Sequence, residues 1–323
     1  MNIAVTGGTG VVGYALLRQL IADGHQVRAL ARSAPAASSV ENLGAVPVEG
    51  DVLDPPALRT LADGAKWLFH VAGVNEMCST DPEHMDLVNI EGTRNVLEAC
   101  RSAGVGRMIH TSSAAAIGEA PGTIGVEGGS HRGSYLSRYE RSKHLSERIL
   151  FDEAGEVDVV AVNPSSVQGP GRATGTGKLI LDVLNGDLPF LVDTQVSIVD
   201  IDDCARGHVL AASNGRNGER YILNGASSGI AEVLDVLAEV TGRRLAPRFV
   251  PGWAAAAGAT AAEIGARIAG RRPRVCREMV RVLRAGHVYD GSRATNELGL
   301  HYTTLESTIQ RTVDWFGEQG LLR

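Results

Sequence analysis

Apolar residues in the first half of the chain fall into two alternating kinds of run. Short runs rich in β-branched residues have the length and composition of buried strands. They are NIAVTG (2–7), QVRALAR (26–32), VPVEGD (46–51), WLFHVAG (67–73), RMIHTSS (107–113) and DVVAVNPSS (158–166). Stretches with helical spacing lie between most of them, as at 11–23, 88–102 and 137–154. Strands that alternate with helices predict right-handed βαβ units, so the predicted fold is α/β with a doubly wound parallel sheet.

The regular alternation weakens after residue 170. The glycine-rich stretch GPGRATGTGK interrupts it, and short strands such as VSIVDI and RYILNG then mix with helices. The expected helices are 178–186, 202–213, 230–241 and 253–269. This pattern predicts a main unit over 1–170 and, over 171–323, a smaller C-terminal lobe laid over the strand ends. Some later segments are expected to return to the sheet.

Composition narrows the class of protein. The chain has 323 residues, 44% of them apolar, and a formal net charge of −6. An acidic balance argues against nucleic-acid binding, because such proteins need a basic face to neutralise phosphates. Small molecules are the expected partners.

The cysteines and residues 1–20 bear on the cellular compartment in which the protein is expected. Cys78, Cys100, Cys204 and Cys276 show no clustered spacing, so neither a disulfide framework nor a zinc site is predicted, and no metal is expected. Glycines interrupt the only candidate leader in residues 1–20, so no signal peptide is expected. The predicted location is a reducing cytoplasm.

A glycine pattern stands between the first strand and the first helix. VTGGTGVVG places Gly7, Gly10 and Gly13 where a Rossmann βαβ unit binds a dinucleotide. Gly7 would permit the tight turn, Gly10 the close approach of a pyrophosphate, and Gly13 the packing of helix on strand. Residues 1–170 are therefore predicted to be a dinucleotide-binding domain, and 171–323 mainly a substrate-binding lobe.

The end of the second strand bears on the choice of dinucleotide. An acidic residue there would bind a free 2′-hydroxyl, whereas an arginine accommodates a 2′-phosphate. This chain has Arg32 at that offset, so NADP(H) is favoured over NAD(H), although an arginine can also stack on adenine without reading the phosphate. Asp51, at the end of the third strand, could bond the adenine amine or simply begin a turn.

Tyr139 and Lys143 are candidates for acid–base chemistry. They lie four residues apart, on one face of a predicted helix, and Lys143 is one of three lysines beside 28 arginines. A nearby ammonium lowers the pKa of a phenol by about 1 to 3 units, which suits proton transfer. We expect Lys143 to act on Tyr139 in this way, because its compact ammonium can also reach ribose hydroxyls.

Ser112 and Ser113 would end the fifth strand, beside the nicotinamide. A hydroxyl there can hydrogen-bond the oxygen of a carbonyl or alcohol substrate. For either serine alone, capping a loop is the more ordinary role.

Taken together, these motifs resemble the extended short-chain dehydrogenase/reductase family, also called the NAD-dependent epimerase/dehydratase family. The resemblance also includes HVAG (70–73), VNIEGTRNVLEAC (88–100), NPSSVQGPG (163–171), VDIDDCARGHVLA (199–211) and GERYILNG (218–225). It implies Ser113 rather than Ser112 as the catalytic hydroxyl, Tyr139 as acid/base and Lys143 as its electrostatic partner. It also implies a structural or proton-relay role for Asn89, and a homodimer formed through the helices of Asn89 and Tyr139.

The same resemblance extends the expected cofactor contacts along the strand ends. The predicted set is Gly7, Thr9, Gly10, Val11, Val12, Gly13, Arg32, Asp51, Val52, Val71, Ala72, Gly73, Thr111, Tyr139, Lys143, Pro164, Ser165, Ser166 and Val167. Of these, the segment Pro164–Val167 is expected to orient the carboxamide of the nicotinamide.

Two branches of the family remain open. Members like dihydroflavonol reductase and 3β-hydroxysteroid dehydrogenase exchange a hydride with an external ketone or alcohol, whereas nucleotide-sugar epimerases and dehydratases return it to the same substrate from a retained NAD. The chain looks closer to the first branch and to hopanoid-associated epimerase-like members, because it lacks a clear RxGD run and has Arg32. The expected function is hydride transfer between NADP(H) and a small, moderately hydrophobic ketone or secondary alcohol. A non-catalytic NADP(H) sensor is the alternative of another class.

The stretch WAAAAGATAAEIGARIAG (253–270) is unusual in composition. It is followed by Arg271, Arg272, Arg274, Arg277, Arg281 and Arg284. A lobe helix with a solvated basic face is the favoured interpretation. Contact of 253–284 with an anionic membrane surface, or with a lipid-like substrate, is the alternative.

Overall fold

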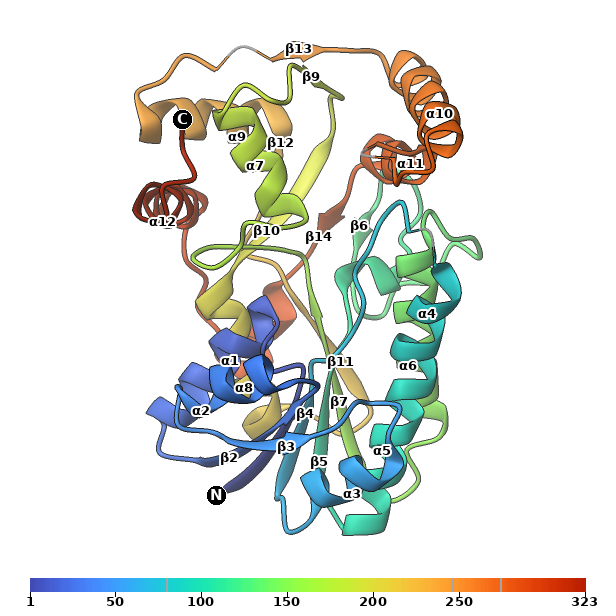
Figure 1. The fold of residues 1–323 in the computed structure, drawn as a ribbon, viewed down its shortest axis with the longest axis vertical. Coiled ribbons are helices and arrows are strands. Elements are labelled where there is room, and N and C mark those ends of the chain that lie inside the picture. The colour runs from blue at the N-terminus through green and yellow to red at the C-terminus, as the bar shows by residue number, and fades with distance from the viewer. Residues whose placement is uncertain (80, 246, 274) are drawn as a thin grey trace.

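A parallel sheet forms the larger half of the computed structural model, which describes residues 1–79, 81–245, 247–273 and 275–323 (Figure 1). Its strands are β1 (Asn2–Thr6), β2 (Gln26–Ala31), β3 (Val46–Glu49), β4 (Trp67–His70), β5 (Arg107–Thr111), β7 (Asp158–Pro164) and β11 (Glu219–Leu223). They lie in the order β3-β2-β1-β4-β5-β7-β11, and every neighbouring pair is parallel. The α/β, doubly wound prediction is confirmed. The strand order reverses between β1 and β4, the place where such sheets bind ligands.

The sheet strands read as continuous apolar runs because helices bury both faces of the sheet. Successive side chains of a strand point to opposite faces, so Ile3 and Val5 pack into one core and Ala4 into the other. The first core is covered by α1 (Val11–Ala22), α2 (Ala34–Glu41) and α8 (Ile201–Asn214). The second is covered by α3 (Pro55–Ala62), α5 (Gly92–Ala103) and α6 (Arg138–Asp152).

Short elements link these layers at the ends of the strands. The helix α4 (Pro82–Asp86) runs through a π-helical turn, η1 (Leu87–Glu91), into α5. A 3-10 turn, η2 (Ala114–Ile117), follows β5 directly. Another π-helical turn, η3 (Ala294–Leu298), packs against α8.

The lobe stands at the carboxyl ends of the sheet strands. Its small sheet has the order β12-β10-β8, formed by β8 (Ser166–Gln168), β10 (Gln195–Asp200) and β12 (Ala226–Gly229). A third core is built by α7 (Thr176–Leu184), α9 (Ile230–Thr241) and α12 (Leu305–Glu318). Because α8 packs on the large sheet and β11 is one of its strands, the chain passes back and forth between the two halves.

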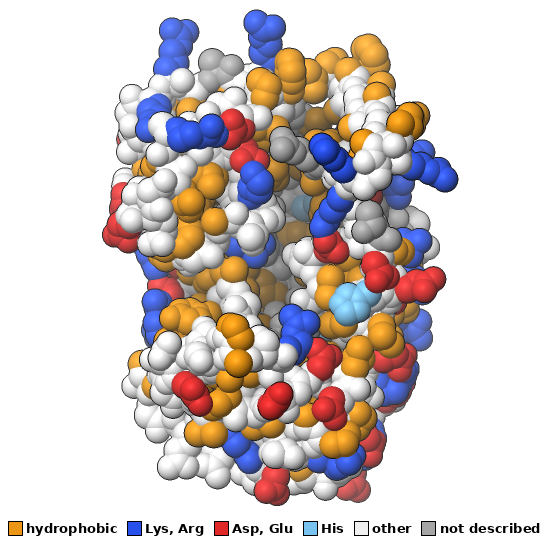
Figure 2. All heavy atoms as spheres, in the orientation of Figure 1, with side chains coloured by type: hydrophobic (Ala, Val, Ile, Leu, Met, Phe, Trp, Pro, Cys, Tyr) orange, Lys and Arg blue, Asp and Glu red, His pale blue; other side chains and the backbone are white. Residues whose placement is uncertain are grey.

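The outer end of the lobe carries a helical pair. The short strands β9 (Phe190–Leu191) and β13 (Arg248–Phe249) pair with each other and lead into α10 (Gly252–Ile268) and α11 (Arg277–Ala285). From α11 the chain returns through β14 (Val288–Tyr289), which pairs with β6 (Ile124–Gly125) of the larger half. Figure 2 shows the surface hollowed where the lobe meets the strand ends. No helix in the described ranges is long and apolar enough to cross a membrane.

Candidate active site

The glycine loop after β1 is shaped by backbone contacts. Gly7 has φ +72°, and a Cβ on it would lie 2.4 Å from the backbone nitrogen of Ala72. A Cβ on Gly13 would lie 2.1 Å from the carbonyl oxygen of Gly7, so only hydrogen allows α1 to approach the turn. Gly10 precedes α1 without a side-chain cap, which leaves the first-turn N–H groups at Val11 and beyond free for an anion.

The other predicted cofactor contacts follow the same edge of the sheet. Val71, Ala72 and Gly73 come directly after β4, and Thr111 ends β5. Pro164 ends β7, while Ser166 and Val167 lie in β8. The track from Thr9 and Val12 across to Val167 therefore lies along the carboxyl ends of the parallel strands.

The adenosine end of this track would be formed after β2 and β3. The exposed Arg32 follows β2, and its Nε lies 3.7 Å from Oδ2 of Asp51. Asp51 also accepts a hydrogen bond from the backbone N–H of Leu53 at 3.0 Å, and Val52 is buried between them. Both interpretations of Asp51, adenine contact and turn residue, are compatible with this geometry.

Two serine hydroxyls at the other end of the track have no protein partner. In the described part of the chain, Oγ of Ser112 and Oγ of Ser165 are buried and make no hydrogen bond. Buried polar atoms are otherwise nearly always bonded, so these two hydroxyls are available to the polar groups of a ligand.

Tyr139 and Lys143 lie on α6, whose first turn is capped by Ser137. The Ser137 hydroxyl accepts a hydrogen bond from the N–H of Glu140 at 3.0 Å. The Lys143 side chain is buried and donates from Nζ to the carbonyl oxygen of Thr111 at 2.6 Å. A Cβ on Gly73 would lie only 3.6 Å from the same Nζ. The ammonium therefore stands between the ends of β4 and β5, where a bulkier guanidinium would not fit without displacing this backbone.

The electrostatics of Tyr139 differ from the sequence-based expectation. Burial raises the pKa of the Tyr139 phenol, and a hydrogen bond with Ser113 and the charge of Arg172 oppose part of that rise. The expected lowering of this pKa by Lys143 is therefore not found. Burial instead lowers the pKa of Lys143 to about 8, while the nearby Glu147 raises it. Lys143 is not among the groups that shift the pKa of Tyr139, and its ammonium is bonded to the carbonyl oxygen of Thr111.

Ser113 follows β5 and begins η2. Its hydroxyl accepts a hydrogen bond from the N–H of Ala115 at 3.3 Å, so it caps the turn as well as facing Tyr139. The neighbouring Ser112 is also buried, and its hydroxyl has no partner among the described residues. Ser113 thus lies against the phenol of Tyr139, and its role as the catalytic hydroxyl stays a prediction.

Asn89 fastens the segment after β4. Its Oδ1 accepts from the N–H of Val74 at 2.7 Å, and its Nδ2 donates to the carbonyl of Val74 at 2.9 Å and to the hydroxyl of Ser142 at 2.8 Å. The side chain is 1% exposed. This geometry serves the structural alternative for Asn89, because the amide ties the wall of the cleft to α6.

A buried chain of hydrogen bonds that the sequence analysis did not identify lies beneath the site. The N–H of Ala72 donates to Oγ1 of Thr6 at 3.2 Å, and that oxygen lies 2.8 Å from Nδ1 of His70. On the other side of the ring, Nε2 of His70 lies 3.1 Å from Oγ1 of Thr93, which donates to the carbonyl of Asn89 at 2.7 Å. Burial, followed by the charge of Lys143, lowers the pKa of His70 to about 3. The neutral imidazole therefore holds β1, β4 and η1 together. The sequence signal for this histidine was the motif HVAG, which begins at the last residue of β4.

Arg172 is a second residue whose role the sequence analysis missed. It lies in the loop after β8, burial lowers its pKa, and its Nε is without a partner among the residues described. Its charge acts on the phenol of Tyr139. The sequence signal for this role was the single arginine in the glycine-rich stretch GPGRATGTGK.

A disulfide connects the lobe to the cleft. Cys78 and Cys276 are joined, with their Cα atoms 5.7 Å apart across 198 residues of sequence. The prediction of no disulfide is therefore wrong, because the pairing arises only when the lobe folds over the segment after β4. The other two cysteines, Cys100 and Cys204, are buried free thiols.

Polar contacts surround this disulfide. Glu278 of α11 accepts hydrogen bonds from the N–H of Cys78 at 3.3 Å and from the N–H of Arg138 at 2.6 Å. Arg138 is the first residue of α6, and Arg272 pairs with Glu76. The helical pair α10–α11 is thus bound to the helix that carries Tyr139.

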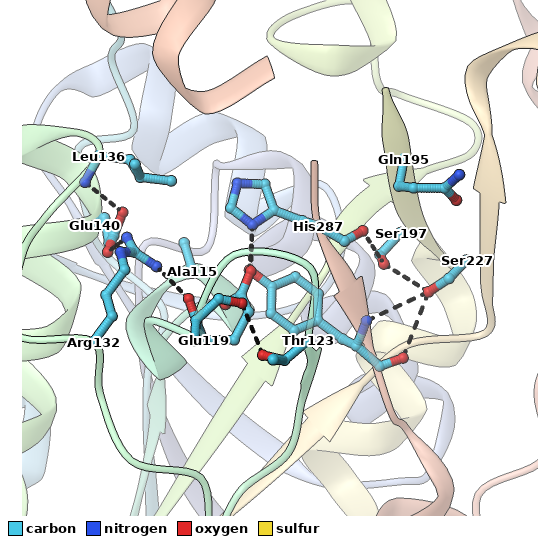
Figure 3. Close-up of polar contacts among 12 residues, drawn as sticks. Ala115, Glu119, Thr123, Arg132, Leu136, Glu140, Gln195, Ser197, Ser227 and His287 are labelled. Carbon is cyan, nitrogen blue, oxygen red and sulfur yellow. Dashed lines mark hydrogen bonds and ion pairs between the residues drawn. The ribbon is translucent and has the colours of Figure 1, made fainter. Parts of the chain in front are cut away.

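A polar cluster fixes the segment after η2 against β14 (Figure 3). Nδ1 of His287 lies 2.5 Å from Oε1 of Glu119. Arg132 donates to the carbonyl of Glu119 at 3.1 Å and pairs with the carboxylate of Glu140. Because Glu140 directly follows Tyr139, this cluster holds both the strand-end turn and the first turn of α6.

The fold and this edge of the sheet define a class of dinucleotide-dependent enzymes. The family model described as "NAD dependent epimerase/dehydratase family" matches residues 3–224. The chain belongs to the NAD-dependent epimerase/dehydratase family, the extended short-chain dehydrogenase/reductases, and is an oxidoreductase of that family.

Similar proteins cover the whole chain. A Synechocystis protein named dihydroflavonol 4-reductase is 35% identical over 99% of this chain and 95% of its own length. Sterol demethylase protein B of Methylococcus capsulatus is 32% identical over 100% of both. The crystal structure of gox2253 superimposes with a TM-score of 0.87 at 33% identity, covering 100% of this chain and 99% of that one.

Proposed function

We propose that the protein is an NADP(H)-dependent reductase or dehydrogenase that transfers a hydride between the nicotinamide and a ketone or secondary alcohol. The proposal rests above all on one observation. Tyr139, Ser113 and Lys143 converge at the carboxyl end of β5, beside the glycine loop and the unpartnered hydroxyls of Ser112 and Ser165. This is the edge of the sheet at which a dinucleotide binds.

The residues divide the work as follows. A bound nicotinamide supplies or accepts the hydride. The Ser113 hydroxyl donates a hydrogen bond to the substrate oxygen, and the Tyr139 phenol delivers the proton to that oxygen during reduction. Lys143 stabilises the phenolate that remains, once ribose hydroxyls share its ammonium with Thr111.

A moderately hydrophobic substrate is supported by the walls of the cleft. The segments after β5 and β7 that border the site carry apolar side chains: Ala115 of η2 is half-buried, and Val167 of β8 is 7% exposed. The names of the two relatives, a dihydroflavonol 4-reductase and a sterol demethylase protein, agree with such a substrate. Arg172 would supply a polar contact near the phenol.

The function is tested by turnover and by the cofactor that the protein carries. We expect NADPH oxidation with one or more hydrophobic ketones, measured as the loss of the near-ultraviolet absorbance of the reduced nicotinamide. The purified protein, once denatured, should release little NAD. Stoichiometric NAD in the denatured supernatant would instead support an epimerase. Cofactor binding without turnover across ketones and nucleotide sugars would support a sensor.

Replacing Arg32 by alanine should weaken the binding of NADPH but not that of NADH. The exposed guanidinium after β2 would lose its bond to the 2′-phosphate, and such charged hydrogen bonds contribute about 1.5 to 3 kcal/mol. We expect the KM for NADPH to rise by about 10- to 100-fold and the KM for NADH to change little. Arg18→Ala on α1 is the matched control, because Arg18 is equally exposed and pairs with Asp202. Equal changes for both cofactors would contradict the NADP(H) preference.

A further inference from the structure

The helix α10 exposes its large apolar side chains to solvent. Trp253, Ala257, Ala261, Ile264 and Ile268 follow a spacing that keeps them on one side of the helix, and all five are exposed. Trp253 is 73%, Ile264 57% and Ile268 83% exposed. The side that faces the protein instead carries small residues. A helix of a soluble lobe normally has the reverse arrangement, so this stripe needs another partner.

The apolar face continues onto the adjoining pair of short strands. Phe249 in β13 is 46% exposed and lies four residues before Trp253, while Phe190 in β9 is 53% exposed and pairs in register with Arg248. Figure 1 places β9, β13 and α10 together at the end of the molecule farthest from β2 and β3. Figure 2 shows hydrophobic side chains gathered at this end, with basic side chains projecting beside them.

The same segment is strongly basic. Residues 243–284 contain ten arginines and two acidic residues, in a protein whose formal net charge is −6. Both acidic residues are engaged: Glu263 pairs with Arg277, and Glu278 accepts the N–H groups of Cys78 and Arg138. The segment also has exposed arginines that form no ion pair with the residues described. They are Arg243, Arg244, Arg248, Arg267 and Arg271, and Arg274 lies outside the described residues.

We propose that α10 and the β9–β13 pair dock on the surface of an anionic lipid bilayer. The stripe would enter the boundary between headgroups and acyl chains, and the arginines would meet lipid phosphates. An anionic bilayer can accept both the apolar stripe and the arginines, whereas a second copy of the chain cannot. A two-fold interface brings the same patch of each copy together, so the arginines of one would oppose those of the other. The proposal takes up the alternative sequence interpretation, membrane contact, in place of a solvated basic face, because the exposed stripe is apolar.

The proposal does not depend on the reductase chemistry. It does give the helical pair a purpose, because α10–α11 is bound through Glu278 and the Cys78–Cys276 disulfide to the start of α6. Docking through α10 would hold the cleft at a fixed distance from the bilayer. A hydrophobic substrate could then be taken up without crossing bulk water.

The test is flotation of the full-length protein with two kinds of vesicle. One is phosphatidylcholine alone, and the other contains about a quarter phosphatidylglycerol, which gives an anionic surface. We expect binding to the anionic vesicles at low ionic strength, weaker binding as salt is added, and little binding to phosphatidylcholine. The double variant Ile264→Ser/Ile268→Ser should bind about tenfold or more weakly, because it removes two side chains that would enter the bilayer.

Matched controls separate docking from unfolding or general stickiness. Val46→Ser/Ile124→Ser alters two equally exposed apolar residues away from α10 and should bind as the wild type does. Far-ultraviolet circular dichroism should be the same for all three proteins. Anionic vesicles should also shift the emission of Trp253 to the blue, a change that the Trp253→Phe variant should lose.

Three outcomes would overturn the proposal. The first is an absence of binding to anionic vesicles at low salt. The second is equal binding by the wild type and the Ile264→Ser/Ile268→Ser variant. The third is a concentration-dependent dimer in analytical ultracentrifugation that this variant abolishes, since a second copy of the chain would then cover the stripe.

Discussion

Replacing Tyr139 by phenylalanine is expected to lower kcat for ketone reduction by about 10²- to 10⁴-fold, the usual contribution of a positioned general acid. The change removes one oxygen, so packing of the ring between Ser113 and the strand ends is kept. The Kd for NADPH, measured by fluorescence titration, should stay within about twofold, because the phenol contributes to proton transfer rather than to holding the dinucleotide.

Tyr135→Phe is the matched control for this variant. Tyr135 lies four residues earlier and packs beside His131 and His144. It takes no part in the proposed proton transfer. We expect it to keep most of the wild-type activity. Full activity in Tyr139→Phe, or an equal loss in both variants, would remove Tyr139 as the acid.

The same proton transfer predicts a pH dependence. Reduction needs a protonated Tyr139 and a charged Lys143, and burial lowers the pKa of Lys143 to about 8. The rate of reduction should therefore be highest below this value and fall as the pH rises through it. The measurement is kcat/KM for the ketone across this range, with NADPH saturating. A profile that stays flat through pH about 8 would contradict the role of Lys143.

The sheet and the positions of the site residues could be predicted because they follow from local patterns. The inner strands of the sheet are apolar runs with both faces buried, so their sequence alone marks them. The four-residue spacing of Tyr139 and Lys143 then sets both on one face of α6, and the parallel register carries Thr111 and Gly73 to the same edge.

Features that depend on long-range packing could not be predicted in this way. Cys78 and Cys276 meet only because α10–α11 folds over the segment after β4. The pKa of Tyr139 depends on how deeply the phenol is buried and on Arg172, a residue in another loop. The spacing of the alanines in α10 was visible, but which side faces solvent was not, since small residues and Ile268 are both compatible with a packed helix.

Two substitutions in the glycine loop should each abolish or weaken cofactor binding, but for different reasons. In Gly13→Ala the new Cβ would lie 2.1 Å from the carbonyl oxygen of Gly7, and backbone on both sides must move. We expect the free energy of unfolding to fall by about 3 kcal/mol, at the upper end of ordinary overpacking, with cofactor binding lost as well. Urea denaturation and NADPH titration measure the two effects.

Gly10→Ala should leave the fold intact and still lose the cofactor. Gly10 has φ −73°, which alanine adopts freely, and its Cβ would meet only the Gly7 oxygen, at 3.3 Å. The methyl group would then stand where a pyrophosphate approaches the backbone, so the Kd for NADPH should rise about tenfold or more while stability is unchanged. Gly128→Ala, where a Cβ meets nothing within 4 Å, is the control for both. If Gly10→Ala binds NADPH as tightly as the wild type, the pyrophosphate does not lie against this loop, and the orientation of the whole cofactor along the strand ends must be revised.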